Sequence, residues 1–359
     1  MHKKLLIPGP TEVSHEILAE QARPLIGHRG KEFTEFYNGI TSKLGKFFEL
    51  PADYHPTTTT SSGTLWFDIV GRSIVKKKAL CCINGAFSQR FGEILRSCGK
   101  QADFVEAEWG SVVKPDIVAE KLESGEYDTL TMCHNESSTG TRSPVAEVGK
   151  IVRKDYPEVM FAVDSVSSMG GDKTLPHEMG VDILFASTQK CFALPPGLAV
   201  AHVSDRAIER SQEVPFRGGY TDMAEIFEFE KKHQTPYTPN VSLLYALDKR
   251  LDLMLAETYP RIYQRHKEMA DLTQKWAKKH FEMFPEEGYE SVTVSCIKNT
   301  LGKNVKDLNQ GLAQRGLEIG NGYGKLAEKT FRIGHMGEWT VAGIKGVLDS
   351  IDEIWGLKN

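Results

Sequence analysis

The sequence predicts an α/β protein, with a large domain built on a mostly parallel sheet between helices and a smaller C-terminal α+β domain. Three observations predict this fold class. The chain has 359 residues, which is more than one typical domain. Over residues 57–203, short apolar runs alternate with amphipathic stretches, as in a doubly wound sheet. After about residue 240 the alternation gives way to two long amphipathic segments and weaker strand patterns, which indicates a second unit.

The expected strands of the large domain are short apolar runs that end in polar residues. They lie at 57–60, 79–83, 102–105, 129–133, 159–163, 183–186 and 198–202, with helices expected between them at 65–75, 87–98, 115–122 and 146–154. Ligands of such sheets bind at the carboxyl ends of the parallel strands. The residues that directly follow each strand are therefore the first candidates for function.

The small domain is expected to begin with two long helices and to end with one. The pattern predicts helices at 241–258, 262–281 and 341–355, strands at 291–296 and 331–334, and an amphipathic stretch at 305–315. A glycine-rich stretch at 320–325 looks like a phosphate-binding loop. However, Ile319 stands where the first glycine of that loop belongs, and Leu326 replaces its Ser or Thr. We therefore expect an ordinary glycine-rich turn.

Composition and charge exclude several classes of protein. A net charge of −4 gives no reason to expect nucleic acid or an anionic membrane as a partner. No apolar run approaches the roughly 18–20 residues that span a bilayer, and the N-terminus lacks the apolar core of a secretory signal. The six cysteines are scattered without a C-x-x-C pair, which favours buried free thiols in a reducing compartment. We expect a cytoplasmic protein without a metal site.

Two of the predicted strand ends are followed by residues suited to an anion and to a flat ring. The first strand leads into Ser62, Gly63 and Thr64 at the start of a helix, where they form either an anion site or an ordinary N-cap. The second strand leads into Phe87, which lies either on a planar cofactor or in the core. Neither feature has a unique meaning by itself.

Two further strand ends carry charge. Asp164 follows an apolar run, where an unpaired carboxylate is costly, so it either caps a helix or holds a cationic nitrogen. Lys190 follows the run 183–186 and precedes a proline-stiffened apolar turn, and a lysine at such a position can be a buried Schiff-base former with a lowered pKa. An anion cradle, a ring, an aspartate and a lysine at successive strand ends are together what pyridoxal phosphate requires.

A set of short motifs links the chain to a known family. In order along the chain they are PGPTEV (8–13), HRGKEF (28–33), SSGT (61–64), NGAFSQR (84–90), HNESSTG (134–140), VDSVSSMGG (163–171), STQKCFALPPG (187–197), QTPYTPNVSLLYAL (234–247) and FRIG (331–334). With these motifs the sequence resembles the class V aminotransferases of the pyridoxal-phosphate fold-type I superfamily over nearly its whole length. The resemblance implies an aminotransferase with pyridoxal 5′-phosphate as its cofactor.

The resemblance also implies roles for individual residues. Lys190 would form the Schiff base with the cofactor and carry the proton, and Asp164 would pair with the pyridinium nitrogen, so these two are the expected catalytic residues. Arg332 would bind the substrate α-carboxylate, because a guanidinium suits bidentate contact. The expected cofactor-binding residues are Ser62, Gly63, Thr64 and Gln189 around the phosphate, Phe87 and Val166 on the two ring faces, Ser137 on the phenolic oxygen, Asp164, Lys190, and Thr238, which in the family reaches the phosphate from the other subunit.

Two substrate classes remain open. In phosphoserine aminotransferases a His-Arg pair from the neighbouring subunit contacts the distal acidic group of the substrate, and His28 and Arg29 match that pair, with Arg217 as a further anion-binding candidate. The main expectation is phosphoserine with 2-oxoglutarate, a reaction of serine biosynthesis, by a ping-pong mechanism through an aldimine. The loop at 62–64 lacks the arginine of standard phosphoserine enzymes, however. This departure favours an alanine- or serine-glyoxylate (serine-pyruvate) aminotransferase as the alternative.

Two readings from other classes are less favoured. Cysteine desulfurase-like lyases share the fold, but they stack a His on the ring, where this sequence has Phe87. They also carry a mobile catalytic Cys, whereas the late cysteine of this sequence, Cys296, stands in a strand-like run. A non-catalytic binding module would not need Lys190 and Asp164 together. An aminotransferase therefore remains the prediction.

The resemblance further implies how the chain is organised and assembled. Residues 1–16 would pack with the small domain, residues 17–247 would form the large cofactor-binding domain, and residues 248–359 the small one. Thr238 lies on a proline-bounded loop far along the chain from Ser62, and in the family this loop crosses to the partner subunit. We therefore expect a homodimer with composite active sites that acts on a small amino acid and a 2-oxo acid.

Overall fold

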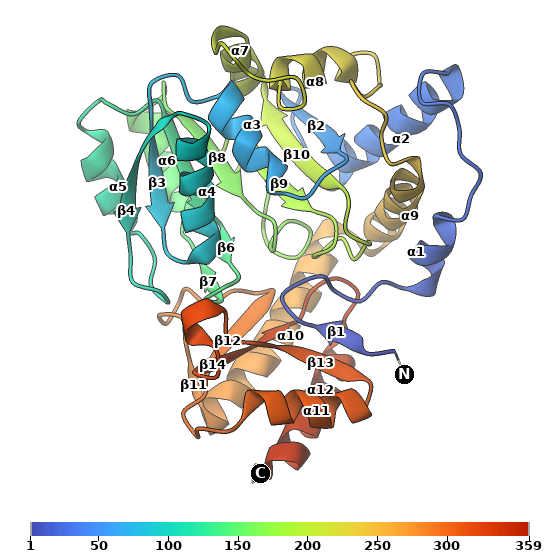
Figure 1. The fold of residues 1–359 in the computed structure, drawn as a ribbon, viewed down its shortest axis with the longest axis vertical. Helices are drawn as coiled ribbons and strands as arrows, with labels where there is room; N and C mark the ends of the chain where they lie inside the picture. Colours follow the sequence, from blue (N-terminus) through green and yellow to red (C-terminus); the bar gives the residue numbers. More distant parts are fainter. Residues whose placement is uncertain (1, 358–359) are drawn as a thin grey trace.

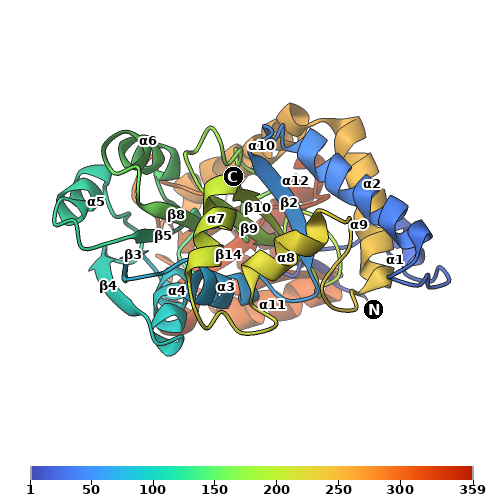
Figure 2. The ribbon, with the colours of Figure 1, turned by 90° about the horizontal axis from the view of Figure 1, so that it is seen from above.

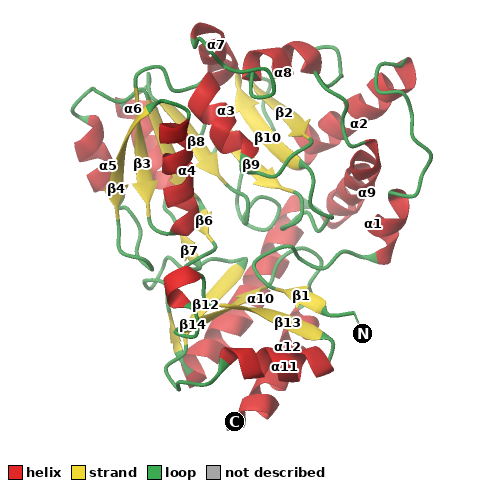
Figure 3. Cartoon of the chain, viewed as in Figure 1, coloured by secondary structure: helices red, strands yellow, loops and turns green. Residues whose placement is uncertain are grey.

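The computed structural model describes residues 2–357, which fold around two main β-sheets (Figures 1 and 3). The larger sheet has the strand order β2-β10-β9-β8-β5-β3-β4. Its strands are β2 (Tyr54–Thr59), β3 (Lys78–Ile83), β4 (Gln101–Glu106), β5 (Thr129–Cys133), β8 (Met160–Asp164), β9 (Ile183–Ser187) and β10 (Ala199–Ser204). β10 runs antiparallel to both of its neighbours, and the other pairs are parallel. The carboxyl ends of all strands except β10 therefore meet at one edge, and every predicted strand is present with small shifts at its ends.

Helices cover both faces of this sheet, as Figure 2 shows from above. One face carries α3 (Leu65–Ser73), α4 (Ala86–Ser97), α7 (Asp205–Glu213) and α8 (Met223–Glu230), and the other carries α2 (Lys31–Phe47), α5 (Pro115–Leu122), α6 (Val145–Asp155) and α9 (Val241–Glu257). Side chains alternate between the two faces along β3: Cys81 packs into the core under α3, α4, α7 and α8, whereas Leu80 and Cys82 pack into the core under α2, α5, α6 and α9. Because both faces are covered, β5, β8 and β9 are buried throughout, and β8 and β9 are apolar up to the single polar residue that ends each strand.

The smaller sheet joins the two ends of the chain. Its strand order is β1-β13-β14-β12-β11, and its strands are β1 (Lys4–Leu6), β11 (Glu282–Met283), β12 (Val294–Lys298), β13 (Leu317–Asn321) and β14 (Thr330–Gly334). β1 pairs in parallel with β13, so the N-terminal strand lies in the small sheet. The helices α10 (Tyr259–His280), α11 (Val305–Gln314) and α12 (Val341–Trp355) contribute to the same core. α10 begins against the large core at Ile262 and ends against the small one at Trp276.

Several elements differ from the sequence-based expectation. α2 was not predicted, although its buried residues Phe33, Tyr37, Ile40 and Leu44 follow the helical spacing. β12 begins later than the predicted strand at 291–296, because the Ser291 hydroxyl accepts hydrogen bonds from the next backbone N–H groups and forms a turn there. The remaining unpredicted elements are α1 (His15–Glu20), β6 (Asn135–Glu136), β7 (Thr141–Arg142) and the 3₁₀ turn η1 (Gly324–Leu326), with β1, β11, β13, α7 and α8. Within residues 2–357, no helix is long and apolar enough to cross a membrane.

Candidate active site

Lys190 lies at the carboxyl edge of the large sheet, shortly after β9. Its side chain is half-buried, and its amine donates a hydrogen bond to the carbonyl of Pro8. Burial lowers the pKa of Lys190 to about 8, against the opposing effect of the Asp164 charge. A lysine with this pKa has a neutral fraction near physiological pH, and the neutral amine is the form that attacks a carbonyl carbon. The site thus contains a nucleophilic amine.

Asp164 is the last residue of β8, the neighbour of β9 in the sheet. Its side chain is buried, with 4% exposure. Burial raises the pKa of Asp164 to about 7, although the backbone N–H of Val166 donates to the carboxylate at 2.8 Å. A buried carboxylate is costly unless a positive charge accompanies it. The position therefore fits a bound group that carries a cationic nitrogen.

Residues 62–64 form a tight turn between β2 and α3, against the end of β9. Gly63 donates its N–H to Ser187 Oγ at 2.6 Å, and a Cβ at Gly63 would lie 2.6 Å from that oxygen and 2.7 Å from a Val166 methyl. The amide oxygen of Gln189 is buried with no hydrogen-bond partner among residues 2–357. Turning this amide over would present its N–H donors instead. The turn, the start of α3 and this amide together suit a phosphate group.

A cavity of about 190 Å³ joins these groups. Its wall contains every predicted cofactor-binding residue except Thr238. Phe87 in the first turn of α4 and Val166 beyond β8 are both half-buried, and each contributes part of its side chain to the wall. A lysine for an aldehyde, a buried aspartate for a ring nitrogen and a glycine turn for a phosphate thus surround one space. The residues present fit pyridoxal phosphate, while the role of each residue stays a prediction.

Arg332 lies on β14 of the small sheet and contacts the wall of the cavity at Ser137. Its Nη1 donates to the carbonyl of Ser137 and its Nε donates to the carbonyl of Asn321, each at 2.9 Å. The guanidinium also lies over the ring of Tyr323, with 5.5 Å to the ring centroid. These contacts hold the guanidinium beside Ser137, which itself lines the cavity. Arg332 is therefore placed to bind a carboxylate where the two domains meet.

The N-terminal segment covers Lys190, which the sequence analysis did not foresee. Gly9 has a positive φ of 94°, and a Cβ there would lie 2.2 Å from Cδ of Lys190. Thr11 donates its N–H to the carbonyl of Gln189 at 3.0 Å and its hydroxyl to the carbonyl of Met336 at 3.2 Å. The segment thus bridges both domains above the lysine. The PGP stretch of the sequence was the available signal.

His28, Arg29 and Thr238 form a second group, which we call the surface group. Arg29 donates from Nη1 to the carbonyl of Thr235 at 2.5 Å and from Nη2 to the carbonyl of Pro236 at 2.6 Å. His28 Nε2 lies 3.4 Å from Thr238 Oγ1. No member of this group lines the cavity around Lys190 within the described chain. Their predicted roles across a subunit interface stay predictions.

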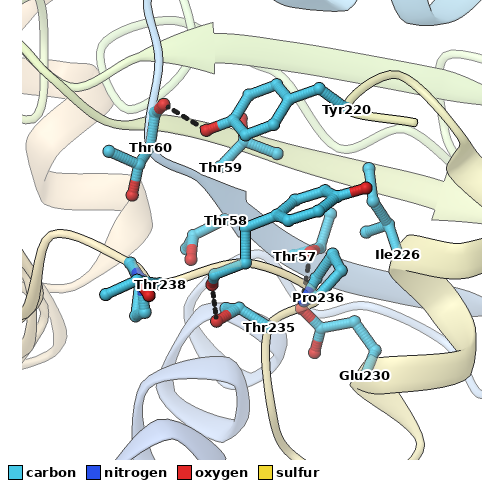
Figure 4. A pocket seen from close by; sticks show the side chains of 12 residues that line it. Thr57, Thr58, Thr59, Thr60, Tyr220, Ile226, Glu230, Thr235, Pro236 and Thr238 are labelled. Atoms are coloured by element: carbon cyan, nitrogen blue, oxygen red, sulfur yellow. Dashed lines mark hydrogen bonds between the residues drawn. The ribbon is translucent and has the colours of Figure 1, made fainter. Parts of the chain in front are cut away.

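Thr238 belongs to a segment that packs on β2 (Figure 4). Tyr220 reaches across and donates to the carbonyl of Thr60 at 3.0 Å. The pocket between these segments measures about 30 Å³, which has room for water and not for a cofactor. Glu230 borders this pocket and accepts a hydrogen bond from Thr57 at 2.5 Å, and burial raises the pKa of Glu230 to about 8. The segment that carries Thr238 thus packs against the partly buried, hydrogen-bonded pair of Thr57 and Glu230.

Arg217 and two cysteines, Cys191 beside Lys190 and Cys296 on β12, have structural surroundings. Arg217 donates to Asp222 at 2.7 Å, which neutralises its charge. Cys191 and Cys296 are buried, and burial raises the pKa of each thiol to about 12. A thiol with such a pKa is a poor nucleophile. Both cysteines are therefore packing residues rather than nucleophiles.

The stretch 320–325 connects β13 to β14, so the expectation of a glycine-rich turn is confirmed. The turn carries Tyr323, whose ring centroid lies 5.4 Å from that of Phe87. Arg90, one helical turn after Phe87, donates to the hydroxyl of Tyr323 at 3.3 Å and lines the cavity. Arg90 ends the motif NGAFSQR, in which only Phe87 was predicted to have a role. Its spacing of three residues from Phe87 on one helix was the available signal.

Comparisons with known proteins agree with this geometry. The model of the family described as aminotransferase class-V matches residues 11–324. An uncharacterized aminotransferase of Methanocaldococcus jannaschii is 37% identical over 97% of this chain and 91% of its own. An L-aspartate–glyoxylate aminotransferase of Paracoccus denitrificans is 29% identical over 94% of this chain and 87% of its own. The crystal structure of a phosphoserine aminotransferase from Cytophaga hutchinsonii has a TM-score of 0.89, with 28% identity over 98% of each chain.

Proposed function

This chain belongs to the class V aminotransferase family, and on that basis we propose that it transfers the amino group of an amino acid to glyoxylate. Membership makes it a pyridoxal-phosphate-dependent aminotransferase of fold type I. The observation that carries the choice of acceptor is the guanidinium of Arg332 beside Ser137, which suits the one carboxylate of glyoxylate. The glyoxylate named for the Paracoccus relative supports the same acceptor.

Different residues around the cavity are proposed to orient the cofactor and to transfer protons. Pyridoxal phosphate, when bound, supplies an aldehyde carbon and a ring that withdraws electrons. Asp164 would hold a proton on the ring nitrogen, and Phe87 and Val166 would contact the two faces of the ring. Lys190 moves a proton at the substrate α-carbon, since its lowered pKa lets the amine accept and release one near neutral pH.

The remaining roles concern the phosphate group of the cofactor and the N-terminal segment that covers Lys190. Ser62, Gly63, Thr64 and Gln189 would bind the phosphate, with help from the N-terminus of α3. Ser137, which lines the same cavity, would donate to the phenolic oxygen of the cofactor. The segment at 8–11 lies over the lysine and excludes water from it, which strengthens the electrostatic interactions inside the cavity.

The donor is proposed to carry an anion on its side chain. Arg90 lines the cavity, and among residues 2–357 it contacts the hydroxyl of Tyr323 and the ring of Phe87 and forms no ion pair with a carboxylate. A guanidinium in this position can bind a distal carboxylate or phosphate. L-Aspartate is therefore the first donor to test, in agreement with the donor named for the Paracoccus relative.

Phosphoserine with 2-oxoglutarate is the second candidate function. The high similarity to the phosphoserine aminotransferase of Cytophaga hutchinsonii favours it, and Arg90 suits a phosphate as well as a carboxylate. The absence of an arginine from residues 62–64 and the pairing of Arg217 with Asp222 favour the glyoxylate reaction instead. We therefore place the phosphoserine reaction second.

A homodimer with composite sites is proposed as the working assembly. Exposed apolar side chains lie near the surface group: Leu25, three residues before His28, is 71% exposed, and Tyr220, which lines the same pocket as Thr238, is 47% exposed. Apolar surface of this kind, close to residues predicted to act across an interface, suits contact with a second copy. In such a dimer Thr238 would complete the phosphate site of the partner subunit.

A donor and acceptor panel tests the proposal. The holoenzyme is assayed with aspartate, serine, alanine and phosphoserine as donors, each against glyoxylate, pyruvate and 2-oxoglutarate. The expected result is the highest kcat/KM with glyoxylate as acceptor and aspartate as donor. A preference for phosphoserine with 2-oxoglutarate would replace the proposal with the second candidate.

A further inference from the structure

Glu136 is a fully buried carboxylate between two walls of the cofactor cavity. Its side chain is 0% exposed. Oε2 accepts hydrogen bonds from the N–H groups of Phe87 at 3.0 Å and of Ser88 at 2.9 Å, and from the Ser88 hydroxyl at 3.1 Å. Oε1 accepts from the N–H of Ser138 at 3.1 Å and from its hydroxyl at 2.6 Å. One carboxylate thus receives five hydrogen bonds from two separate segments.

The first segment is the start of α4. Gly85 stands at the N-cap position of this helix, where a side chain normally accepts hydrogen bonds from the first free N–H groups. Glycine has no such side chain, and a Cβ at Gly85 would lie 2.4 Å from Cγ of Glu136. Glu136 therefore occupies the space and performs the capping from another part of the chain. Its negative charge also interacts favourably with the helix N-terminus.

The second segment is the loop that carries Ser137. Besides its side-chain contacts with Ser138, the backbone carbonyl of Glu136 accepts from the N–H groups of Thr139 at 3.1 Å and Gly140 at 2.8 Å. The Ser138 hydroxyl in turn accepts from the N–H of Ala86 at 3.1 Å. The loop and the helix are thus joined on both sides of the carboxylate. Any shift of the loop would move the first turn of α4 with it.

We propose that Glu136 is a positioning residue for the cofactor, which ties the Phe87 turn of α4 to the Ser137 loop and so sets the distance between ring face and phenolic oxygen. The inference rests on the cofactor roles assigned to Phe87 and Ser137. It does not depend on which donor or acceptor is used. The competing explanation is that Glu136 stabilises the fold and leaves the cofactor site unaffected.

Removal of the charge with little change in shape is the first test. Glu136→Gln keeps the size of the side chain but places an amide against N–H donors on both sides, so one set of hydrogen bonds fails. The matched control is Glu93→Gln, which removes an exposed carboxylate from the same helix. The apoproteins are titrated with pyridoxal phosphate, and cofactor Kd, the absorbance maximum of the bound cofactor and the melting temperature are recorded.

The expected result is a cofactor Kd at least about tenfold weaker for Glu136→Gln, with a shifted absorbance maximum, and no change for Glu93→Gln. A lower melting temperature with unchanged Kd and spectrum would overturn the proposal, because a purely structural role has that signature. Failure of the parent protein to transfer amino groups would count against the proposed function. Such a failure would not affect the test of Glu136, which compares the pyridoxal phosphate Kd of Glu136→Gln with that of the parent protein.

A relocated carboxylate separates capping from positioning. In the double variant Gly85→Asp with Glu136→Ala, the new carboxylate can accept from the N–H groups of Phe87 and Ser88 and so cap α4 locally. A Cβ at residue 85 would lie 2.6 Å from Ser138 Oγ, so the Ser137 loop has to move away from its present position. We expect the double variant to recover melting temperature relative to Glu136→Ala while its cofactor Kd stays at least about tenfold weaker than in the parent. Recovery of the Kd to within about twofold would overturn the proposal, since capping alone would then suffice.

Discussion

The cofactor cavity and the surface group differ in how far one chain completes them. In the cavity, Asp164 and Lys190 lie close enough for their charges to interact, and burial shifts the pKa of both. In the surface group, Arg29 is exposed and donates to main-chain carbonyls, and Thr238 is exposed beside His28. Charged groups acquire unusual chemistry when water is removed from them. The cavity therefore has perturbed charged groups within one chain, whereas the side chains of Arg29 and Thr238 stay exposed to solvent in it.

The largest expected effect comes from removing the amine of the cavity. Lys190→Ala should lower amino transfer by about 10³-fold or more, because both the nucleophile and the proton carrier are lost. Rates are measured with saturating cofactor, and circular dichroism checks that the fold is intact. Lys121→Ala, which removes a charge from the distant helix α5, is the control. Amino transfer by Lys190→Ala at near the parent rate would show that Lys190 is neither the nucleophile nor the proton carrier.

Mixing two inactive variants tests whether the surface group serves the partner. One subunit carries Lys190→Ala, and the other carries Thr238→Ala and Arg29→Ala. In each mixed dimer one site has all of its residues intact, so random mixing should restore about a quarter of the parental activity. Activity is measured after co-refolding, with each variant alone as the baseline. A fully active monomer in solution would contradict the composite site and remove the contrast between the two regions.

Asp164→Asn should raise the activation barrier by about 3 kcal/mol, which lowers kcat roughly 100-fold, because a neutral ring withdraws electrons poorly. The measurement is single-turnover amino transfer with the cofactor fully bound. Cofactor affinity should change less than kcat, since the phosphate turn is untouched. A loss of kcat smaller than tenfold would contradict the role assigned to this carboxylate.

The same carboxylate makes the stability of the apoprotein depend on pH. The pKa of about 7 in the folded apoprotein lies above the ordinary value of 3.8, so between these values the folded state binds one proton more than the unfolded chain. Stability therefore falls as pH rises through this window. The parent protein should therefore lose about 2–3 kcal/mol of unfolding free energy from pH 5 to pH 8 that Asp164→Asn does not lose. The difference in unfolding free energy between variant and parent should shift by that amount in favour of the variant. Urea unfolding at both pH values measures it, and a constant difference would speak against the raised pKa.

The smallest expected effect compares an arginine from each region. Arg90→Gln should lower kcat/KM for donors with a distal anion by about tenfold and change alanine much less, because alanine has no group to meet the guanidinium. Arg29→Ala is the matched variant from the surface group. We expect its losses to be similar for all donors, since its recorded partners are backbone carbonyls. A loss selective for phosphoserine or aspartate in Arg29→Ala would instead bring the surface group into the substrate site.

The strand ends of the large domain could be predicted because their signals are local. Apolar runs bounded by polar residues predicted every strand of the large sheet, and the residues after them included Asp164, Lys190 and the turn at 62–64. The site residues on this edge follow from strand order and direction. α2 carried an equally clear spacing of buried residues and could have been predicted in the same way. β1 is only three residues long, too short for a periodic signal.

The sequence by itself determined which residues stand at the carboxyl edge of the sheet, because alternation and turn composition are properties of short segments. Only the tertiary structure decided that Pro8 would cover Lys190, that β1 would pair with β13, and that Glu136 would cap a helix that starts fifty residues earlier. These contacts join segments whose separation along the chain is set by the packing of whole elements. No local sequence pattern predicts the hydrogen-bond partners of Glu136. Its partners include N–H groups at the start of α4, which come within reach only when the helix and the loop are packed together.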